Sequence, residues 1–273
     1  MEDNKLKSLE TIERAIIKRY RKKIWSKFTK AINEYELLES GDKVGVAISG
    51  GKDSLLLAKL IQELNRHSKY DFEVEYLAMD PGYNKENRKR LEDYCDYLDI
   101  PVKIYDSDVF EVSEKLSKNN PCYMCARMRR GFLYSTAQDL GCNKLALGHH
   151  FNDVIETTML NITMAGSFKT MLPKLRADNF ENMELIRPLY WVREEDIIRW
   201  RDYSGLEPLD CACEVAAEKT SSSRFMVKEW IEKMKEFNDV VDINIFHAAE
   251  NINMDMVLGW KDEDGVHSFM DQY

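Results

Sequence analysis

Hydrophobic and polar positions follow two alternating periods along most of the chain. Short apolar or β-branched runs predict buried strands, and longer stretches that are apolar at every third or fourth position predict helices. The predicted strands are 43–48, 72–79, 102–105, 144–147 and 186–189. The predicted helices are 54–66, 84–98, 127–140, 153–164, 194–203 and 223–234. This alternation predicts a doubly wound α/β fold, in which helices cover both faces of a mainly parallel sheet.

The two ends of the chain depart from this alternation. Apolar residues at helical spacing, among them Ile16, Ile24 and Ile32, predict one helix over residues 6–38. Residues 14–30 hold eight Lys or Arg and no Asp or Glu, whereas 236–273 carry a local net charge of −8 out of −9 for the chain. We therefore expect three parts: a basic helical extension (1–40), a catalytic α/β domain (41–215) and a helical, acidic extension (216–273).

Composition narrows the class of protein. A length of 273 residues with 44% hydrophobic residues fits a globular protein with one large domain and appendages. No apolar run reaches the roughly 20 residues that cross a bilayer, and the first residues lack the apolar core of a signal peptide. We expect a cytoplasmic protein, where a reducing environment disfavours disulfides between its six cysteines. Cys95 and Cys142 fall in helical patterns and are expected to be packing thiols.

The most informative motif follows the first predicted strand. Residues 49–54 read Ser-Gly-Gly-Lys-Asp-Ser and lead into a helix. Two glycines allow a tight turn that brings backbone N–H groups against phosphate oxygens, and the helix start adds a positive dipole end. The lysine adds a charge, and the aspartate would cap the helix or hold Mg²⁺. The run does not fit the Walker A pattern, and its structural alternative is an ordinary Gly-Gly turn before a capped helix. The predicted ATP-binding loop is Ser49, Gly50, Gly51, Lys52, Asp53 and Ser54.

A pair of closely spaced cysteines forms the second motif. Cys122 and Cys125 are separated by two residues, which suits one metal ion, one iron–sulfur cluster or a redox pair. Arg127, Arg129 and Arg130 follow them and would favour thiolates and attract phosphate. Two buried thiols are the structural alternative.

A third motif lies where the fourth predicted strand ends. Gly148 and His149 follow that strand, and Asp153 opens the next helix. Ligands of such sheets bind at the carboxyl ends of the strands, the edge that also carries the phosphate loop. We therefore expect Gly148 and His149 near the nucleotide, Asp153 holding Mg²⁺ or a hydroxyl group, and the adenine near Met79. The alternative is a histidine pair packed at a helix entry.

Together these motifs resemble a known enzyme family. The loop is similar to the signature of the PP-loop, or N-type, ATP pyrophosphatases. It is followed by Pro-Cys-x-x-Cys-x-Arg-x-Arg-Arg-Gly, Leu-Gly-His-His-x-x-Asp, Pro-Lys-Leu (173–175) and Ile-Arg-Pro-Leu (186–189). That order, from about residue 43 to 211, resembles the tRNA 2-thiocytidine synthetase family, whose relatives include 2-thiouridine synthetases with an iron–sulfur cluster.

The resemblance implies an adenine nucleotide alpha hydrolase-like fold and ATP-dependent sulfur transfer to tRNA. ATP would adenylate a pyrimidine oxygen, at C2 of cytidine, with Lys52, Asp53, Asp153 and Mg²⁺ assisting, and sulfur would then displace AMP. The resemblance also implies a 4Fe–4S cluster on Cys122, Cys125 and a third cysteine. For the third, this chain has Cys-x-Cys (211 and 213) where the family has a pattern resembling Cys-x-x-Cys. Counting from Arg187 favours Cys211 and counting back from Arg224 favours Cys213, and we expect Cys211, with Cys213 as the alternative.

The implied partners are tRNA and a sulfur donor, either a protein or inorganic sulfide, and a homodimer is compatible with the sequence. Lys22 and Lys23, together with the three arginines after Cys125, are the candidate tRNA contacts, although a solvated basic face would also explain the N-terminal helix. Two other functions stay open. One is adenylation and amidation of a small molecule, which leaves the cysteines and the basic helix unused. The other is a non-catalytic regulator that binds ATP or an iron–sulfur cluster, which leaves the intact loop unexplained.

Overall fold

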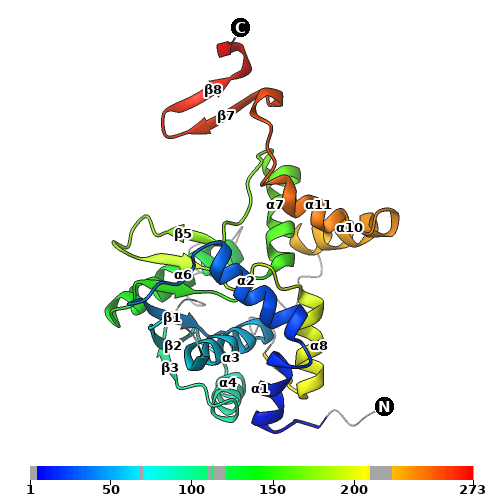
Figure 1. Cartoon of the computed structure of the whole chain (residues 1–273). Coiled ribbons are helices and arrows are strands. Elements are labelled where there is room, and N and C mark those ends of the chain that lie inside the picture. Colours follow the sequence, from blue (N-terminus) through cyan, green and yellow to red (C-terminus); the bar gives the residue numbers. More distant parts are fainter. Residues whose placement is uncertain are drawn as a thin grey trace. The chain divides into compact units, whose positions relative to one another are not determined.

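The structure is a computed structural model, and it describes residues 5–67, 70–107, 109, 112, 121–209 and 223–272. The chain divides into two compact units (Figure 1). The first comprises Met1–Val154 and Leu172–Ser222, and the second comprises Ile155–Met171 and Ser223–Tyr273. The three-part division expected from the sequence stays a prediction.

The first unit is built on a six-stranded sheet of order β3-β2-β1-β4-β6-β5. All neighbours are parallel except β5, which pairs antiparallel with β6 at the edge. The strands are β1 (Lys43–Ala47), β2 (Glu73–Asp80), β3 (Val102–Asp106), β4 (Lys144–Ala146), β5 (Lys174–Arg176) and β6 (Glu184–Ile186). The doubly wound α/β fold is therefore confirmed.

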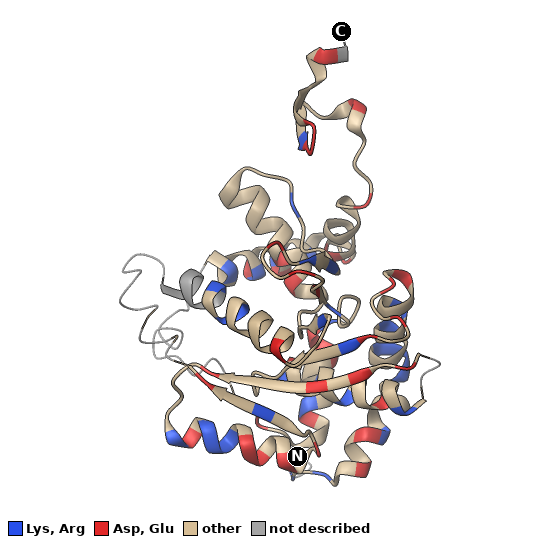
Figure 2. Ribbon diagram, turned by 90° about the vertical axis from the view of Figure 1, so that its left-hand side faces the viewer, with Lys and Arg blue, Asp and Glu red and all other residues tan. Residues whose placement is uncertain are grey.

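Helices cover both faces of this sheet. In Figures 1 and 2, α6 (Pro121–Asp139) lies on one side, and α3 (Lys52–His67) and α4 (Lys85–Tyr97) lie on the other. Beneath α6, Tyr134 and Ala137 pack with Leu77 and Leu145 of the sheet. On the other side, three consecutive leucines of α3 are fully buried, and α3 packs against α1 (Leu9–Ile17) and α8 (Glu194–Ser204). These apolar faces fix both layers of helices on the sheet.

The strand order creates one switch point. From β1 the chain winds outward through β2 to β3, and then it crosses back to β4 on the other side of β1. The connections after β1 and β4 therefore leave the sheet in opposite directions and open a crevice at their carboxyl ends, where such sheets bind ligands.

Two predictions about local structure were wrong. Residues 6–38 form α1, a π-helical segment (Arg21–Trp25) and α2 (Ser26–Glu34) in place of one helix. The break lies at Tyr20, whose N–H donates to Ala15 O at 2.8 Å and whose hydroxyl donates to Arg199 O on α8. A strand was predicted at 186–189, but the observed strand, β6, ends at Ile186. Pro188 has no N–H to donate to a neighbouring strand, and residues 187–190 form a turn.

The second unit contains most of the acidic C-terminal part. It includes α10 (Ser223–Phe237) and α11 (Val241–Ala248), which pack through Val227, Ile231 and Phe246. A hairpin of β7 (Gly259–Asp262) and β8 (Gly265–Ser268) follows, which the sequence analysis did not predict. The helix α7 (Phe151–Ala165) begins in the first unit and ends in the second. Among the described residues, no helix has the length and apolar character of a membrane span.

Candidate functional site

The loop of residues 49–54 lies at the switch point. The strand β1 ends at Ala47, Ile48 N–H still donates to Leu77 O of β2 at 2.8 Å, and α3 starts at Lys52. The N–H groups of a helix start have no intrahelical partners, and the helix dipole is positive there. The local structure therefore offers anion-binding donors at the place the sequence predicted.

Backbone contacts hold the loop in its tight turn. Gly50 has φ +79°, and its carbonyl accepts the N–H of Leu209 at 3.0 Å. A Cβ on Gly50 would lie 2.8 Å from Leu209 Cδ1, so a larger residue does not fit without movement. The hydroxyl of Ser54 donates to Gly51 O at 2.9 Å and accepts the N–H of Ser49 at 3.1 Å. These bonds close the loop on the first turn of α3.

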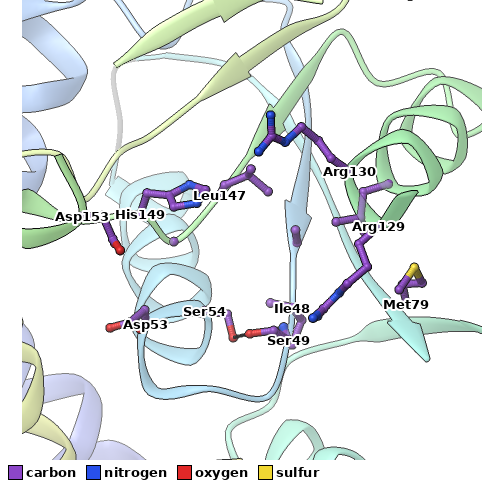
Figure 3. Close-up of a pocket in the computed structure, with 13 residues that line it drawn as sticks. Ile48, Ser49, Asp53, Ser54, Met79, Arg129, Arg130, Leu147, His149 and Asp153 are labelled. Atoms are coloured by element: carbon purple, nitrogen blue, oxygen red, sulfur yellow. Dashed lines mark hydrogen bonds between the residues drawn. The ribbon is translucent and has the colours of Figure 1, made fainter. Parts of the chain in front are cut away.

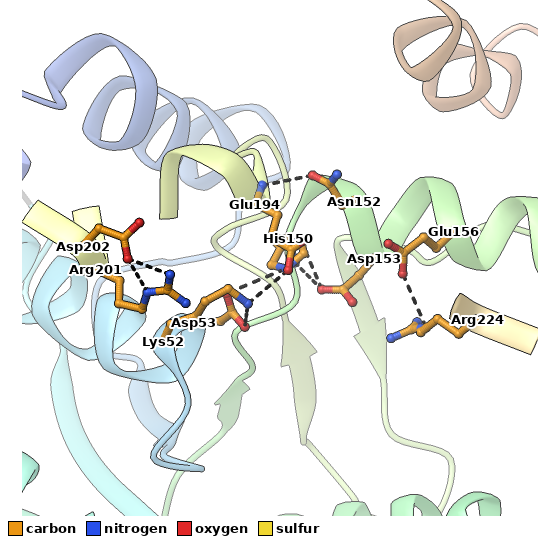
Figure 4. A network of polar contacts seen from close by, with 10 residues as sticks. All are labelled: Lys52, Asp53, His150, Asn152, Asp153, Glu156, Glu194, Arg201, Asp202 and Arg224. Atoms are coloured by element: carbon orange, nitrogen blue, oxygen red, sulfur yellow. Dashed lines mark hydrogen bonds and ion pairs between the residues drawn. The ribbon is translucent and has the colours of Figure 1, made fainter. Parts of the chain in front are cut away.

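Lys52 is paired with two carboxylates (Figure 4). Its Nζ lies 3.2 Å from Asp53 Oδ2 and 3.1 Å from Glu194 Oε1, at the start of α8. Burial alone would lower the pKa of Lys52, but the charges and hydrogen bonds of Asp53 and Glu194 raise it above the ordinary lysine value. Lys52 therefore stays protonated at neutral pH.

The end of β4 meets the start of α3 directly. A Cβ on Gly148 would lie 3.2 Å from Asp53 C and Ser54 N, which is closer than most Cβ contacts, so glycine favours this close approach. As a result, His150 Nε2 lies 3.7 Å from Asp53 Oδ1, and His150 Nδ1 lies 3.4 Å from Asp153 Oδ2. The two motifs that the sequence placed at neighbouring strand ends form one polar cluster.

The two aspartates of this cluster differ in their surroundings. Burial raises the pKa of Asp53 above the usual aspartate value, although the charges of His150 and Lys52 act in the opposite direction. Asp53 Oδ1 has no hydrogen-bond partner among the described residues. Asp153 Oδ2 accepts the N–H of His150 at 2.9 Å, a bond from the third residue of α7 back to its N-cap. Asp53 thus keeps an oxygen available for a ligand, while Asp153 also caps a helix.

A cavity of about 340 Å³ opens beside this cluster (Figure 3). That volume is within the usual range of small-molecule sites, roughly 300–1,000 Å³. Six predicted ATP-binding residues, Ser49, Asp53, Ser54, Met79, Gly148 and His149, line it, as does Asp153, whereas Gly50, Gly51 and Lys52 do not. The remaining lining residues are Ala47, Ile48, Leu133, Leu147, Arg129 and Arg130.

Arginines of α6 form the wall opposite the polar cluster. Figure 2 shows basic residues in the first half of α6 and none in its second half. In Figure 3, Arg129 extends toward Ser49 and Arg130 extends toward Leu147. Arg127 is exposed and does not line the cavity. Two of the three arginines predicted to contact tRNA therefore lie where they would also meet phosphates of a nucleotide in the cavity.

The cysteines divide into two groups. Cys95 and Cys142 are buried, as predicted, and burial raises their thiol pKa values to about 12 and about 11. Cys122 and Cys125 lie in the first turns of the α6 backbone, and the predictions for Cys211 and Cys213 fall outside the described residues. Within the described parts of the chain, no three His, Cys, Asp or Glu side chains gather as a metal site.

The backbone of α6 brings the Cys-x-x-Cys motif toward the cavity. Arg129, which lines the cavity, follows Cys125 by four residues, about 6 Å along a helix axis. Two closely spaced cysteines fit part of the ligand set of an iron–sulfur cluster, and the third ligand stays a prediction.

Sequence reasoning missed Asn152 and Glu194. Glu194 entered the sequence analysis only as the first residue of the predicted helix 194–203, yet its carboxylate contacts Lys52, and its N–H donates to Asn152 Oδ1 at 3.0 Å. No local pattern signals these contacts, because the partners come from three different helices.

Known proteins are similar to this chain over most of its length. Residues 20–207 match the PP-loop domain family. The chain is 34% identical over 226 residues to the tRNA-cytidine(32) 2-sulfurtransferase of Pelobacter propionicus, covering 82% of this chain and 83% of that protein. It is 35% identical over 233 residues to the tRNA-cytidine(32) 2-sulfurtransferase of Citrifermentans bemidjiense, covering 85% and 91%.

A solved structure supports the same fold. The U34-tRNA thiolase NcsA from Methanococcus maripaludis, solved with its 4Fe–4S cluster, superposes with a TM-score of 0.66 at 22% identity. The match covers 82% of this chain and 76% of that chain. The architecture, the loop at the switch point and these similarities agree: the chain belongs to the PP-loop domain family and, within it, to the family of the tRNA-cytidine(32) 2-sulfurtransferases.

Proposed function

We propose that this protein is an ATP-dependent sulfurtransferase that replaces the C2 oxygen of a tRNA cytidine, at position 32, with sulfur. The single observation that carries the proposal is the junction of the loop 49–54 with the His150–Asp153 segment at the switch point of the sheet. Relatives of the same family bear the name of this activity.

ATP binds with its phosphates on the loop and its adenine toward Met79. The backbone N–H groups of the α3 start and the ammonium of Lys52 stabilise the charge that develops on the leaving pyrophosphate. Asp53 and Asp153 are the residues that would hold Mg²⁺, because both carboxylates line the cavity. The ion, when bound, adds further positive charge at the leaving group.

Chemistry at the base proceeds in two displacements. The C2 oxygen of the cytidine attacks the α-phosphorus of ATP, the bond to pyrophosphate breaks, and the oxygen becomes part of an adenylate. Sulfur at the oxidation level of sulfide then attacks C2, and AMP leaves with the former oxygen. Arg129 and Arg130 bind the phosphate of the adenylate from the opposite wall and compensate its charge.

Cys122, Cys125 and Cys211 would hold a 4Fe–4S cluster, with Cys213 as the alternative to Cys211. The bound cluster would supply the sulfur, received from a donor protein or from inorganic sulfide. The positive charges of the arginines after Cys125 would favour thiolates at the ligand cysteines.

The tRNA backbone binds a basic surface next to the cavity. Burial, and then the nearby charge of Arg193, lower the pKa of Lys27, while the charges of Asp196 and Glu195 act in the opposite direction. Arg193 lies over the ring of Phe151, 4.7 Å from the ring centroid. Phe151 is the residue that follows His150 in the chain. Lys23 lies 3.2 Å from the buried Asp196, so it is partly neutralised. Lys22 is exposed on the same π-helical segment. These cations can bind phosphates that flank a base inserted into the cavity.

Pyrophosphate formation by the anaerobically reconstituted protein tests this function. We expect release that requires both ATP and tRNA, absorbance of an iron–sulfur cluster, and 2-thiocytidine in the recovered tRNA. Release of pyrophosphate with a small amide acceptor and without tRNA would support the amidating alternative. No release under any condition would support the regulator.

A further inference from the structure

Lys52 receives a second carboxylate from a distant part of the chain. Its neighbour Asp53 would suffice to pair one lysine, yet Glu194 Oε1 lies 3.1 Å from Nζ as well. The Glu194 side chain is 17% exposed and the Lys52 side chain 19% exposed, so water screens this pair only partly. Figure 4 shows Glu194 reaching from the start of α8 to the start of α3.

The backbone of Glu194 is fixed independently of this ion pair. Its N–H donates to the side-chain oxygen of Asn152, the second residue of α7. Arg193, the N-cap residue of α8, makes no side-chain cap bond, so Asn152 satisfies one of the N–H groups of that helix start from outside the helix. Replacing the Glu194 side chain therefore leaves the cap of α8 in place.

Two carboxylates restrict the direction of the Lys52 ammonium. A lysine ammonium has three N–H donors. Asp53 and Glu194 each accept one, which leaves one donor for an oxygen of the pyrophosphate. With Asp53 alone, rotation about the terminal bond of Lys52 would spread the remaining donors over several directions.

The same arrangement places an additional negative charge beside an anion-binding loop. One lysine faces two carboxylates, so the trio carries a net charge of −1 and opposes the binding of a polyanion. An interaction that weakens the binding of ATP but orders an N–H donor for the leaving pyrophosphate raises kcat and does not improve affinity.

We propose that Glu194 is a positioning residue that aims Lys52 at the pyrophosphate of ATP and thereby raises the rate of adenylation while weakening ATP binding. This inference rests on the proposed function, because it requires that the loop 49–54 binds ATP.

Four holoenzymes test it: the wild type, Glu194→Ala, Glu194→Gln and the control Glu195→Gln. Glu195 is the next residue of the same helix, is 57% exposed and pairs with Arg199. The measurements are kcat and KM for ATP-dependent pyrophosphate formation at saturating tRNA, and the Kd of α,β-methylene ATP by calorimetry.

We expect Glu194→Ala to lower kcat by roughly ten- to a hundredfold, the range for lost orientation of a catalytic group. The Kd of the analogue should fall, by up to about tenfold, because a repelling charge is removed. Glu194→Gln, which keeps an acceptor oxygen, should recover part of kcat. Glu195→Gln should match the wild type.

Two results would overturn the inference while leaving the proposed function intact. One is an unchanged kcat in Glu194→Ala, and the other is a Kd that stays equal to that of the wild type or rises. If the wild type neither binds the analogue nor forms pyrophosphate, the proposed function fails instead.

Discussion

Replacing Gly50 with alanine tests the geometry of the loop most sharply. Gly50 has φ +79°, a left-handed conformation that costs an alanine about 1–2 kcal/mol. The new Cβ would also lie 2.8 Å from Leu209 Cδ1 and 3.1 Å from Leu91 Cδ1, and both leucines are buried. Overpacking of this kind costs about 1–3 kcal/mol. The free energy of unfolding should therefore fall by roughly 2–5 kcal/mol, the sum of both effects.

Gly141 provides a matched control. Its φ of +75° is nearly the same, but a Cβ there would have no atom within 4 Å. Gly141→Ala should therefore lose only the conformational part, about 1–2 kcal/mol. Urea unfolding followed by tryptophan fluorescence compares the two variants.

The same pair of variants separates stability from binding. In Gly50→Ala, movement of Leu209 and the loop should raise the Kd of an ATP analogue at least about tenfold, which corresponds to about 1.4 kcal/mol of binding free energy. Gly141→Ala should bind as the wild type does. Equal loss of stability in both variants, or unchanged ATP binding in Gly50→Ala, would refute the reasoning that Leu209 and Leu91 pack against this turn.

Three further predictions concern the chemistry of the site. The free energy of unfolding of Asp153→Asn should lie within about 0.5 kcal/mol of the wild-type value, because asparagine also accepts hydrogen bonds at a helix start. The variant should nevertheless form pyrophosphate at least about a hundredfold more slowly, if the carboxylate assists the leaving group. Burial raises the pKa of Asp53, and its ionised form holds Lys52. The rate of pyrophosphate formation should therefore fall on acidification as Asp53 becomes protonated, at a pH above the usual pKa of an aspartate. A pH–rate profile with its acid limb at or below about pH 4 would contradict this. Anaerobic absorbance spectra should lose the cluster bands in Cys122→Ser and Cys125→Ser but keep them in Cys142→Ser, whose thiol is buried in the core; bands retained in the first two variants would exclude them as ligands.

The sequence was sufficient for features that depend on short segments. The strand 43–48 was predicted within one residue of its end, and the loop after it was located correctly, because a buried strand, a Gly-Gly turn and a helix start all leave local patterns. The meeting of Asp53 with His150 also followed from a general rule about parallel sheets, since both lie at carboxyl ends of neighbouring strands.

Features set by distant contacts were not predictable in this way. At the break, the hydroxyl of Tyr20 donates to Arg199 O on α8, a long-range contact that no helical periodicity reveals. Glu194 reaches Lys52 only because α8 packs beside α3, and its acidic character at a helix start has an ordinary explanation in the helix dipole. The choice between Cys211 and Cys213 still depends on the counting of residues.

Nucleoside analysis of tRNA tests the central claim most directly. In a strain that lacks the gene, mass spectrometry should find no 2-thiocytidine in tRNA, and expression of the wild-type protein should restore it. Lys52→Ala, which removes the cation of the loop, should fail to restore it although the protein accumulates. An unchanged level of 2-thiocytidine in the deletion strain, or full restoration by Lys52→Ala, would contradict the proposal that this chain thiolates tRNA with ATP bound at residues 49–54.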